Sequence, residues 1–431
     1  MATIAALHRR FLESAGVCTD TRSVTPGSLF FALKGPRFDA NAFAAEALAK
    51  GAAHAVVDDP AAAADERCTL VPDALSALQQ LARHHRRAFG MPVLAITGSN
   101  GKTTTKELAC AVMSAHRSTL ATEGNLNNHI GVPLTLLRLK PEHRFAIIEM
   151  GASKPGDIAE LMRIAEPTHG LITNIGKAHL EGFGGLDGVV RTKTELYRWL
   201  AEHGGTVFVN ADDALLQVQA AGLERQVAYG TGPAARHRGG PLEGDGALRF
   251  WFAGADGRRI EVGTRLVGAY NLANALAAVA VGQHFGVPDA LIADALGAYA
   301  PSNSRSQLLD TGRNSVVLDA YNANPTSMEA ALRNLAEMAS PLPKLAVLGD
   351  MLELGAEGPA EHRRMARLCA ELGIEAVFVG PLFAAAAPPG QEAQPDAAAL
   401  AKRWEQDAPR GRLILLKGSR GMRLEALVPL L

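Results

Sequence analysis

The chain has 431 residues, of which 48% are hydrophobic, 20% charged and 5% aromatic. This length exceeds what one ordinary hydrophobic core supports, so two to three globular domains are expected. The formal net charge of −1 excludes a strong positive field, and we expect neither nucleic-acid binding nor attraction to anionic lipid surfaces.

The cysteines and the apolar runs indicate the compartment. Four cysteines lie far apart and form no C-x-x-C pair, so neither a disulfide framework nor a zinc site is expected. No apolar stretch approaches the length of a membrane-spanning helix, and the first ten residues contain no signal-peptide core. These features predict a cytoplasmic protein without membrane insertion, and we expect it to be a monomer.

The first segment has the pattern of a small α/β unit. A Pro-Gly turn at residues 26–27 precedes a strand-type run at 28–33, and a second short run follows at 53–57. A helical pattern then extends from residue 73 to residue 89 and leads into a Gly-Met-Pro break. The sequence therefore predicts a first domain over residues 1–88.

From residue 89 onward, strand and helix patterns alternate. Apolar runs typical of buried strands are separated by helical stretches and occupy residues 93–97, 145–149, 170–174 and 206–210. Such alternation predicts a parallel sheet covered by helices on both faces. Residues 231–264 have Gly-rich turns and predict an antiparallel extension, and a helix is expected at 271–281. Together they predict a second domain over residues 89–302.

The same alternation resumes near Pro301. Strand-type runs occupy residues 315–319, 345–349, 376–380 and 413–417. They predict a small doubly wound, Rossmann-like sheet over residues 303–431, with residues 384–399 as a loop of low complexity. The predicted fold class is thus α/β, with three domains and a mainly parallel central sheet.

The end of the run at 93–97 carries the most informative motif in the chain. The turn and helix start that follow it are formed by Gly98, Ser99, Asn100, Gly101, Lys102, Thr103 and Thr104. Strand, glycine loop and helix N-terminus are typical of a phosphate cradle, in which Lys102 reaches the β- and γ-phosphates and the Thr103 hydroxyl binds Mg²⁺. The loop is tighter than the Walker pattern. The alternative is an ordinary glycine turn before a core helix.

An acidic residue, Glu149, ends the strand-type run at 145–149. Ligands of open α/β sheets bind at the carboxyl ends of strands, so this carboxylate is placed to hold the Mg²⁺ that bridges the phosphates of ATP. A helix cap or a surface charge is the alternative. The phosphate loop in the same domain favours the metal.

Two further segments connect the chain to a known family. Residues 174–184 read Asn-Ile-Gly-Lys-Ala-His-Leu-Glu-Gly-Phe-Gly, and Lys193 stands two residues before Glu195. Together with the tight phosphate loop, this pattern resembles the Mur ligase family, which includes the folylpolyglutamate synthases. The resemblance implies that His179 binds a second Mg²⁺ and that Lys193 is carbamylated, which turns a cation into an anion suited to a hard metal ion. Without the resemblance, Lys193 would be an exposed helix lysine in an ordinary ion pair.

Other parts of the chain match further elements of this family. The resemblance places an amide-rich loop with Asn125, Asn127 and Asn128 beside the acyl-bearing substrate. It places Asn271, at the start of a predicted helix, near the adenine of ATP. The segment from Asp20 to Gly35 matches the start of the UDP-sugar domain. The substrate contacts implied there are Thr21, Arg22, Lys34 and Gly35.

The start of the third domain carries the string that discriminates between substrates. Residues 319–325 read Asp-Ala-Tyr-Asn-Ala-Asn-Pro. Family members that add the third peptide residue usually carry Asp-Tyr-Ala-His-Thr-Pro, and folylpolyglutamate synthases usually carry Asp-Gly-Ala-His-Asn-Pro. The version here resembles that of members that add D-alanyl-D-alanine. It implies that Asp319 contacts ATP. The implied substrate contacts are Tyr321, Asn322 and Asn324.

Arg305, just before this string, is implied to reach the nucleotide across an interdomain cleft. Ser304 stands where relatives often have glycine, so the backbone support of Arg305 departs from the family pattern.

The residues by themselves indicate an ATP- and Mg²⁺-dependent enzyme of several domains. The resemblance adds the substrates, UDP-N-acetylmuramoyl-tripeptide and D-alanyl-D-alanine, and an acyl-phosphate route to a peptidoglycan precursor, with the third domain rotating toward the others when ATP binds. The alternatives are another acid–amine ligase, such as a folylpolyglutamate synthase, or a catalytically silent nucleotide-binding scaffold. The string at 319–325 argues against the first. The intact set Lys102, Glu149, His179 and Lys193 argues against the second.

Overall fold

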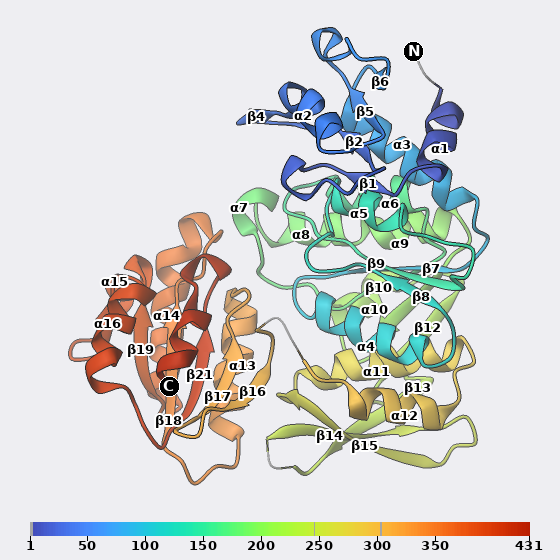
Figure 1. Ribbon diagram of the computed structural model, residues 1–431. Helices are drawn as coiled ribbons and strands as arrows, with labels where there is room; N and C mark the ends of the chain where they lie inside the picture. The colour runs from blue at the N-terminus through green and yellow to red at the C-terminus, as the bar shows by residue number, and fades with distance from the viewer. Residues whose placement is uncertain (1–2, 245, 302–303) are drawn as a thin grey trace.

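Three sheets divide the chain into three bodies, coloured from blue to red along the sequence in Figure 1. This computed structural model describes residues 3–244, 246–301 and 304–431. The first body lies against one end of the central body, and the third lies beside it (Figure 1). The α/β fold class with mainly parallel sheets is confirmed. The expected boundary between residues 302 and 303 lies outside the described residues, and the domain limits stay a prediction.

The first body is a four-stranded parallel sheet in the order β1-β2-β5-β6, with a small separate hairpin. Its strands are β1 (Val17–Cys18), β2 (Leu29–Phe31), β5 (His54–Val57) and β6 (Cys68–Leu70), and the hairpin is β3 (Lys34–Gly35) with β4 (Phe38–Asp39). The helices are α1 (Ile4–Leu12), α2 (Ala44–Ala49) and α3 (Ala74–Arg87), with 3₁₀ turns η1 (Thr21–Ser23), η2 (Ala40–Phe43) and η3 (Pro60–Ala62). Helix α3 begins where predicted because the Asp73 side chain accepts a hydrogen bond from the Ser76 N–H.

The central body contains a nine-stranded sheet in the order β15-β14-β13-β12-β11-β10-β7-β9-β8. The strands are β7 (Val93–Thr97), β8 (Thr119–Ala121), β9 (Phe145–Glu149), β10 (His169–Ile172), β11 (Thr206–Asn210), β12 (Gln226–Gly230), β13 (His237–Leu242), β14 (Ala247–Ala253) and β15 (Arg259–Val267). Pairing is parallel from β8 to β13, and β13, β14 and β15 pair antiparallel, as the extension at 231–264 predicted.

Helices cover both faces of this sheet. They are α4 (Lys102–Ser114), α5 (Gly131–Leu136), α6 (Asp157–Ala165), α7 (Leu180–Phe183), α8 (Leu186–Lys193), α9 (Glu195–Glu202), α10 (Ala214–Ala220), α11 (Asn271–His284) and α12 (Asp289–Ala298). Along β7, Val93 and Ala95 pack in one buried cluster, whereas Leu94 and Ile96 pack in another. Alternate side chains of a strand point to opposite faces, so both faces are buried and the strand reads as a continuous apolar run.

The third body is a six-stranded sheet in the order β16-β17-β21-β18-β19-β20, with only the β16–β17 pair antiparallel. Its strands are β16 (Gln307–Asp310), β17 (Ser315–Asp319), β18 (Lys344–Gly349), β19 (Glu375–Val379), β20 (Glu392–Gln394) and β21 (Leu413–Lys417). The helices are α13 (Pro325–Glu337), α14 (Gly358–Glu371), α15 (Pro381–Ala386) and α16 (Ala397–Asp407), with 3₁₀ turns η4 (Gly355–Glu357), η5 (Arg420–Met422) and η6 (Leu424–Leu430).

The expectation that residues 384–399 form only a loop was wrong. The end of α15, the edge strand β20 and the start of α16 all fall within this range. Strand β20 pairs in parallel with β19 through its backbone, and such a short edge pair needs no apolar periodicity.

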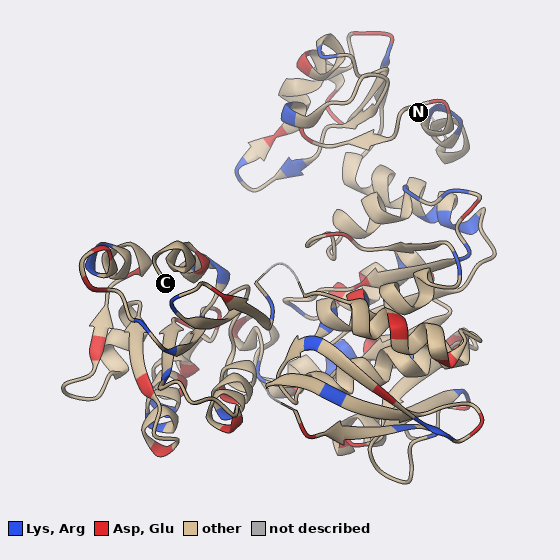
Figure 2. Cartoon of the chain, turned by 60° about the horizontal axis from the view of Figure 1, so that its bottom comes forward, with Lys and Arg blue, Asp and Glu red and all other residues tan. Residues whose placement is uncertain are grey.

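The three bodies are joined in two different ways. Leu7 and Phe11 of α1 belong to the same buried cluster as Ile148 and Met150 at β9, so the first and central bodies share a hydrophobic core. The third body packs its apolar residues in clusters of its own, to which β15 contributes Val267. Acidic and basic residues are interspersed over all three bodies (Figure 2). Among the described residues, no helix is long and apolar enough to span a membrane.

Candidate active site

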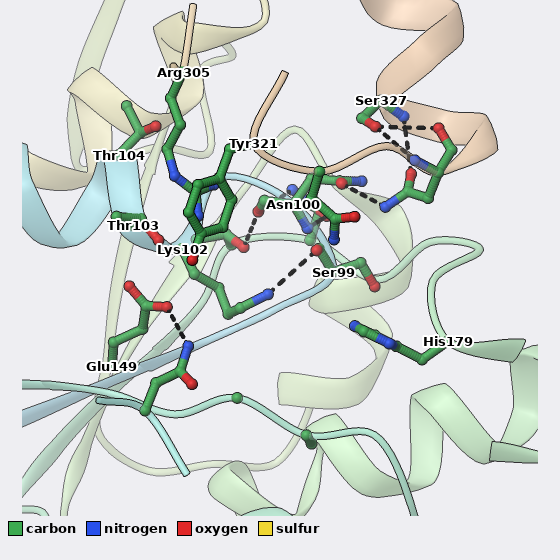
Figure 3. Close-up of a pocket in the computed structure, with 18 of the residues that line it drawn as sticks. Ser99, Asn100, Lys102, Thr103, Thr104, Glu149, His179, Arg305, Tyr321 and Ser327 are labelled. Atoms are coloured by element: carbon green, nitrogen blue, oxygen red, sulfur yellow. Dashed lines mark hydrogen bonds between the residues drawn. The ribbon is translucent and has the colours of Figure 1, made fainter. Parts of the chain in front are cut away.

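A cavity of about 960 Å³ opens at the carboxyl edge of the central sheet, beyond the ends of β7 and β9. Its lining includes residues of all three bodies, from Leu75 on α3, through residues 99–104, to residues 319–327 of the third body. The structure therefore brings together segments that are more than 200 residues apart in the sequence. Figure 3 shows the phosphate-loop residues facing Glu149, Tyr321 and His179 across this cavity.

The glycines of the predicted phosphate loop are required by its shape. Gly98 has a φ of +144°, and a Cβ atom there would overlap the Thr173 hydroxyl. Gly101 has a φ of +77° and caps the N-terminus of α4 without a side chain. The loop is tied to the neighbouring strand end, because Asn174 Oδ1 accepts a hydrogen bond of 3.0 Å from the Asn100 N–H. The backbone at the start of α4 thus faces the cavity, as an anion site requires.

Lys102 is folded back onto this loop. Its Nζ donates to the Gly98 carbonyl at 2.7 Å and to the Ser99 carbonyl at 3.3 Å. Burial lowers the pKa of Lys102, and the positive charge of Arg305 lowers it further, while Glu149 opposes the shift. Both hydrogen bonds are to neutral carbonyls. An anion bound in the cavity would be a stronger acceptor, so the ammonium group could donate to it instead.

Glu149 is the buried carboxylate of the site, with 1% of its surface exposed. Its Oε1 accepts a hydrogen bond of 2.7 Å from Asn127 Nδ2, whereas its buried Oε2 has no partner. A buried carboxylate oxygen without a partner is costly, and a hard cation would satisfy it. Thr103, buried and on the cavity wall, supplies a hydroxyl of the kind that binds Mg²⁺ beside a phosphate loop. The donors fit the predicted metal ion.

Lys193 ends α8 and is not among the residues that line the cavity. It is 2% exposed, with its Nζ 3.5 Å from Thr97 Oγ1 and 5.8 Å from the centre of the Phe183 ring. Burial, together with the charge of Lys102, holds the pKa of Lys193 well below its usual value. The interpretation of Lys193 as an exposed helix lysine was wrong. A neutral amine is the form that adds to CO₂, so the environment fits the carbamate prediction without testing it.

His179 lines the cavity and reaches the third body. Its backbone has a φ of +51°, and its Nδ1 lies 2.6 Å from Glu353 Oε2. Within the described residues, no three His, Cys, Asp or Glu side chains are placed to hold a metal ion by themselves. A metal bound by Glu149 or His179 therefore needs further ligands, such as phosphate oxygens or a carbamate.

The amide-rich loop divides between two hollows. Asn127 and Asn128 line the main cavity, and Asn128 Oδ1 also accepts from the Ile130 and Gly131 N–H groups at the start of α5. Asn125 lines a smaller hollow of about 240 Å³. Asn271 is 1% exposed on the main cavity wall, where its Nδ2 donates to the Val267 carbonyl at 2.7 Å.

The third body contributes the opposite wall. The Arg305 guanidinium stacks 3.6 Å from the centre of the Tyr321 ring. Ser304 has a φ of +55°, the left-handed conformation that glycine adopts without strain, so a serine at this position is strained. Asp319 is held from two sides, by an ion pair of 2.6 Å with Lys417 Nζ and by the Ser306 N–H.

Asn322 and Asn324 also line this wall. Asn324 Nδ2 donates to Asn100 Oδ1 at 2.7 Å, which links the third body directly to the phosphate loop. The Asn324 side chain also caps α13, because its oxygen accepts from the Ser327 N–H.

The predicted contacts in the first body lie away from the cavity. Arg22 forms an exposed ion pair with Asp20, and Lys34 Nζ lies 2.9 Å from Asp58 Oδ1. Thr21 and Gly35 stand in η1 and β3 of the same body. The sequence analysis predicted no site role for Lys417, Asn174 or Glu353. Lys417 and Asn174 follow or end apolar strand runs, a signal that could have drawn attention to them.

Three family models match the chain. The Mur ligase family catalytic domain matches residues 13–86, the Mur ligase middle domain residues 96–282, and the Mur ligase glutamate ligase domain residues 304–420. A UDP-N-acetylmuramoyl-tripeptide–D-alanyl-D-alanine ligase of Bacillus subtilis is 35% identical over 96% of this chain and 92% of its own length. The enzyme of that name from Escherichia coli is 39% identical over 84% of this chain and 80% of its own length.

Solved structures agree with these matches. A crystal structure of MurF from Acinetobacter baumannii superposes with a TM-score of 0.87 at 33% identity, covering 99% of this chain and 98% of that one. MurF from Thermotoga maritima in complex with ADP gives a TM-score of 0.85 at 26% identity, covering 97% of each chain.

Three α/β bodies around one phosphate loop define a multidomain nucleotide-binding protein. The chain belongs to the Mur ligase family. The family resemblance drawn from the sequence is thereby confirmed.

Proposed function

We propose that this protein is an ATP- and Mg²⁺-dependent ligase that joins D-alanyl-D-alanine to UDP-N-acetylmuramoyl-tripeptide, giving the pentapeptide precursor of peptidoglycan with ADP and phosphate. The observation that carries the proposal is the single cavity in which the phosphate loop, Glu149 and the segment 319–324 of the third body meet. The substrates follow the names of relatives that align over most of the chain. A cytoplasmic location is part of the proposal, since the reaction consumes ATP and all four cysteines are free.

The proposed reaction has two steps. An oxygen of the tripeptide's terminal carboxylate attacks the γ-phosphorus of ATP, the bond to the bridging oxygen breaks, and ADP leaves. The amine of D-alanyl-D-alanine then attacks the carbonyl carbon of the acyl phosphate, phosphate leaves, and the amine loses a proton. Mg²⁺ would neutralise charge on the transferring phosphoryl group.

The residues predicted from the sequence are assigned to parts of this reaction. Gly98 to Thr104 would cradle the phosphates, with Lys102 turning from the loop carbonyls to the γ-phosphate, and Thr103 and Glu149 would hold Mg²⁺. His179 would bind a second Mg²⁺. Asn271, Arg305 and Asp319 would contact the nucleotide. Asn125, Asn127 and Asn128 would face the acyl end, and Tyr321, Asn322 and Asn324 the incoming dipeptide. The UDP end would lie on the first body, at Thr21, Arg22, Lys34 and Gly35.

The assignment is tested by phosphate release from ATP with Mg²⁺ and UDP-N-acetylmuramoyl-tripeptide, with and without D-alanyl-D-alanine. We expect release that depends on the dipeptide and matches formation of the UDP-pentapeptide. Turnover with a folate and glutamate instead would support the proposed ligase reaction but contradict the proposed cell-wall substrates. Silence with every acid–amine pair would favour a nucleotide-binding scaffold.

Carbamylation of Lys193 is a separate part of the proposal. We expect Lys193→Ala to lose activity and to regain part of it when a short-chain carboxylate is added, because the added anion can occupy the space of the carbamate. Full activity of Lys193→Ala without any addition would remove the modification from the mechanism.

A further inference from the structure

The loop that carries His179 is held by the third body. Lys177 Nζ lies 2.8 Å from Glu361 Oε1 and 3.5 Å from Glu357 Oε2, and His179 Nδ1 lies 2.6 Å from Glu353 Oε2. The three carboxylates stand in one segment that runs from the loop after β18, through η4, into the first turn of α14. One segment of the third body therefore makes every ion pair of this loop that the described residues contain.

The two segments meet in an unusual backbone conformation. His179 has a φ of +51° and Glu353 a φ of +69°, both in the left-handed region that residues other than glycine rarely adopt. Strained residues persist where the surroundings hold them, and they gather at functional sites. At Gly355 the contact is close enough that a Cβ atom would lie 3.3 Å from the Cβ of Glu181. The left-handed backbone conformations of both residues thus help to place the two side chains of the His179–Glu353 pair.

The pair engages only one nitrogen of the imidazole. In the neutral imidazole, a carboxylate at Nδ1 accepts the proton of Nδ1–H, which leaves the lone pair on Nε2. The ring lies on the cavity wall, and in Figure 3 it points toward the side of the cavity that holds Lys102. A histidine that binds a metal ion through one nitrogen usually donates the other ring N–H to a carboxylate, which fixes the tautomer and the ring orientation.

We propose that Glu353 is a positioning residue for metal binding. From the third body, its carboxylate holds His179 in the tautomer and orientation that present Nε2 to a divalent cation in the cavity. The inference rests on the proposed function in one respect, the assignment of His179 as a metal ligand. Because Glu353 belongs to the third body and His179 to the central one, docking of the third body and metal affinity are coupled. By linkage, the metal ion favours the docked arrangement to the same extent.

The first test reads the tautomer directly. Nitrogen chemical shifts of ¹⁵N-histidine-labelled protein distinguish Nδ1–H from Nε2–H, and a His179→Gln variant identifies the signal. We expect Nδ1–H in the unaltered protein and a shift toward Nε2–H in Glu353→Ala. The matched control is Glu357→Ala, which removes an equal charge from the same segment but pairs with Lys177 instead of His179. An unchanged His179 signal in Glu353→Ala would overturn the proposal.

The second test measures the metal itself. Binding of Mn²⁺ in the presence of ADP, followed by electron paramagnetic resonance without tripeptide or dipeptide, should weaken about 10-fold or more in Glu353→Ala. Glu357→Ala should stay within about twofold of the unaltered protein, as its carboxylate does not touch the imidazole. Equal losses in the two variants, or no loss in Glu353→Ala, would overturn the proposal.

A third pair of variants separates positioning from general damage to the interface. Glu353→Gln keeps the side-chain length and an oxygen acceptor, so it should retain Mn²⁺ affinity better than Glu353→Ala. In a His179→Gln background, Glu353→Ala should cause no further loss, since the imidazole that Glu353 positions is already absent. A full additional loss there would contradict the proposal. Neither measurement uses the ligase substrates, so failure of the proposed reaction and failure of this inference are told apart.

Discussion

Glu149 and Lys193 are buried ionisable residues that form no ion pair with any other described residue. Glu149 keeps one carboxylate oxygen without a hydrogen bond, and Lys193 meets a hydroxyl and an aromatic ring. Each arrangement costs stability in the protein by itself, because burial desolvates the ionisable group and no ion pair offsets the cost. Residues in such surroundings are poised for a ligand or a modification that supplies the missing charge.

Substituting Glu149 by Gln should separate stability from activity. The amide oxygen of Gln can still accept the hydrogen bond from Asn127, while the buried negative charge is gone. We expect the free energy of unfolding to stay level or to rise, by up to about 2 kcal/mol. We also expect Mg²⁺-dependent phosphate release to fall by a factor of about 10² to 10³, since a metal contact in the transition state is lost. Urea unfolding measures the expected change in stability, and the phosphate assay measures the expected loss of activity. Full activity of Glu149→Gln would contradict the role of Glu149 as a metal ligand.

A histidine outside the cavity should make stability depend on pH. Burial, with a smaller contribution from His284, lowers the pKa of His169 to about 4. The unfolded chain binds this proton near pH 6.5 and the folded chain does not, so stability falls as the pH drops through this interval. At pH 5 the loss from this residue is about 2 kcal/mol.

Comparing urea midpoints near pH 7.5 and pH 5 in the unaltered protein and in His169→Gln isolates this contribution. The variant should lose less stability on acidification, whereas His116→Gln, at an exposed histidine, should behave like the unaltered protein. An identical loss in His169→Gln would show that other groups carry the acid sensitivity.

At the scale of elements, the sequence predicts those strands and loops whose signal lies in adjacent residues. It does not predict contacts between residues far apart in the chain. Strands such as β7 could be predicted because burial on both faces makes them continuous apolar runs, and the phosphate loop because all its parts are adjacent in the chain. Strands β8 and β20 could not, since three-residue strands at sheet edges carry no readable period. The ion pairs Asp319–Lys417 and His179–Glu353 join residues far apart in the sequence, so no spacing indicates them.

The β7–α4 loop offers a prediction about one such local element. Alanine at Gly98 would overlap the Thr173 hydroxyl and would have to adopt a φ of +144°, so the loop must move. We expect Gly98→Ala to weaken ATP binding by about 10-fold or more, the equivalent of losing about one strong hydrogen bond to phosphate. Gly90→Ala is the matched control, because a Cβ there meets nothing within 4 Å. Calorimetric titration with ATP measures both, and equal affinities would show that the loop adapts.

At the scale of the whole molecule, the two junctions between bodies differ in chemistry. Apolar residues of α1 and α3 share a core with the central sheet, whereas the third body contacts the phosphate loop and the His179 loop mainly through polar pairs. Separating an apolar core exposes surface to water, while polar pairs exchange readily for hydrogen bonds with solvent. We therefore expect the third body to be the one that moves, although Val267 of β15 packs in its apolar cluster, and we expect the first to stay with the central body.

Lys177 provides the test of this asymmetry. Its Nζ pairs with Glu361, whose side chain is 8% exposed, so Lys177→Met leaves a nearly buried carboxylate with Arg364 as its remaining ion-pair partner among the described residues. Fluorescent labels on the central and third bodies should report a longer and broader distance distribution in Lys177→Met, while labels on the first and central bodies report no change. Lys402→Met, which removes an exposed charge from α16, should match the unaltered protein at both positions. If the distance between the central and third bodies stayed unchanged in Lys177→Met, the polar pairs would not be what holds the third body in place.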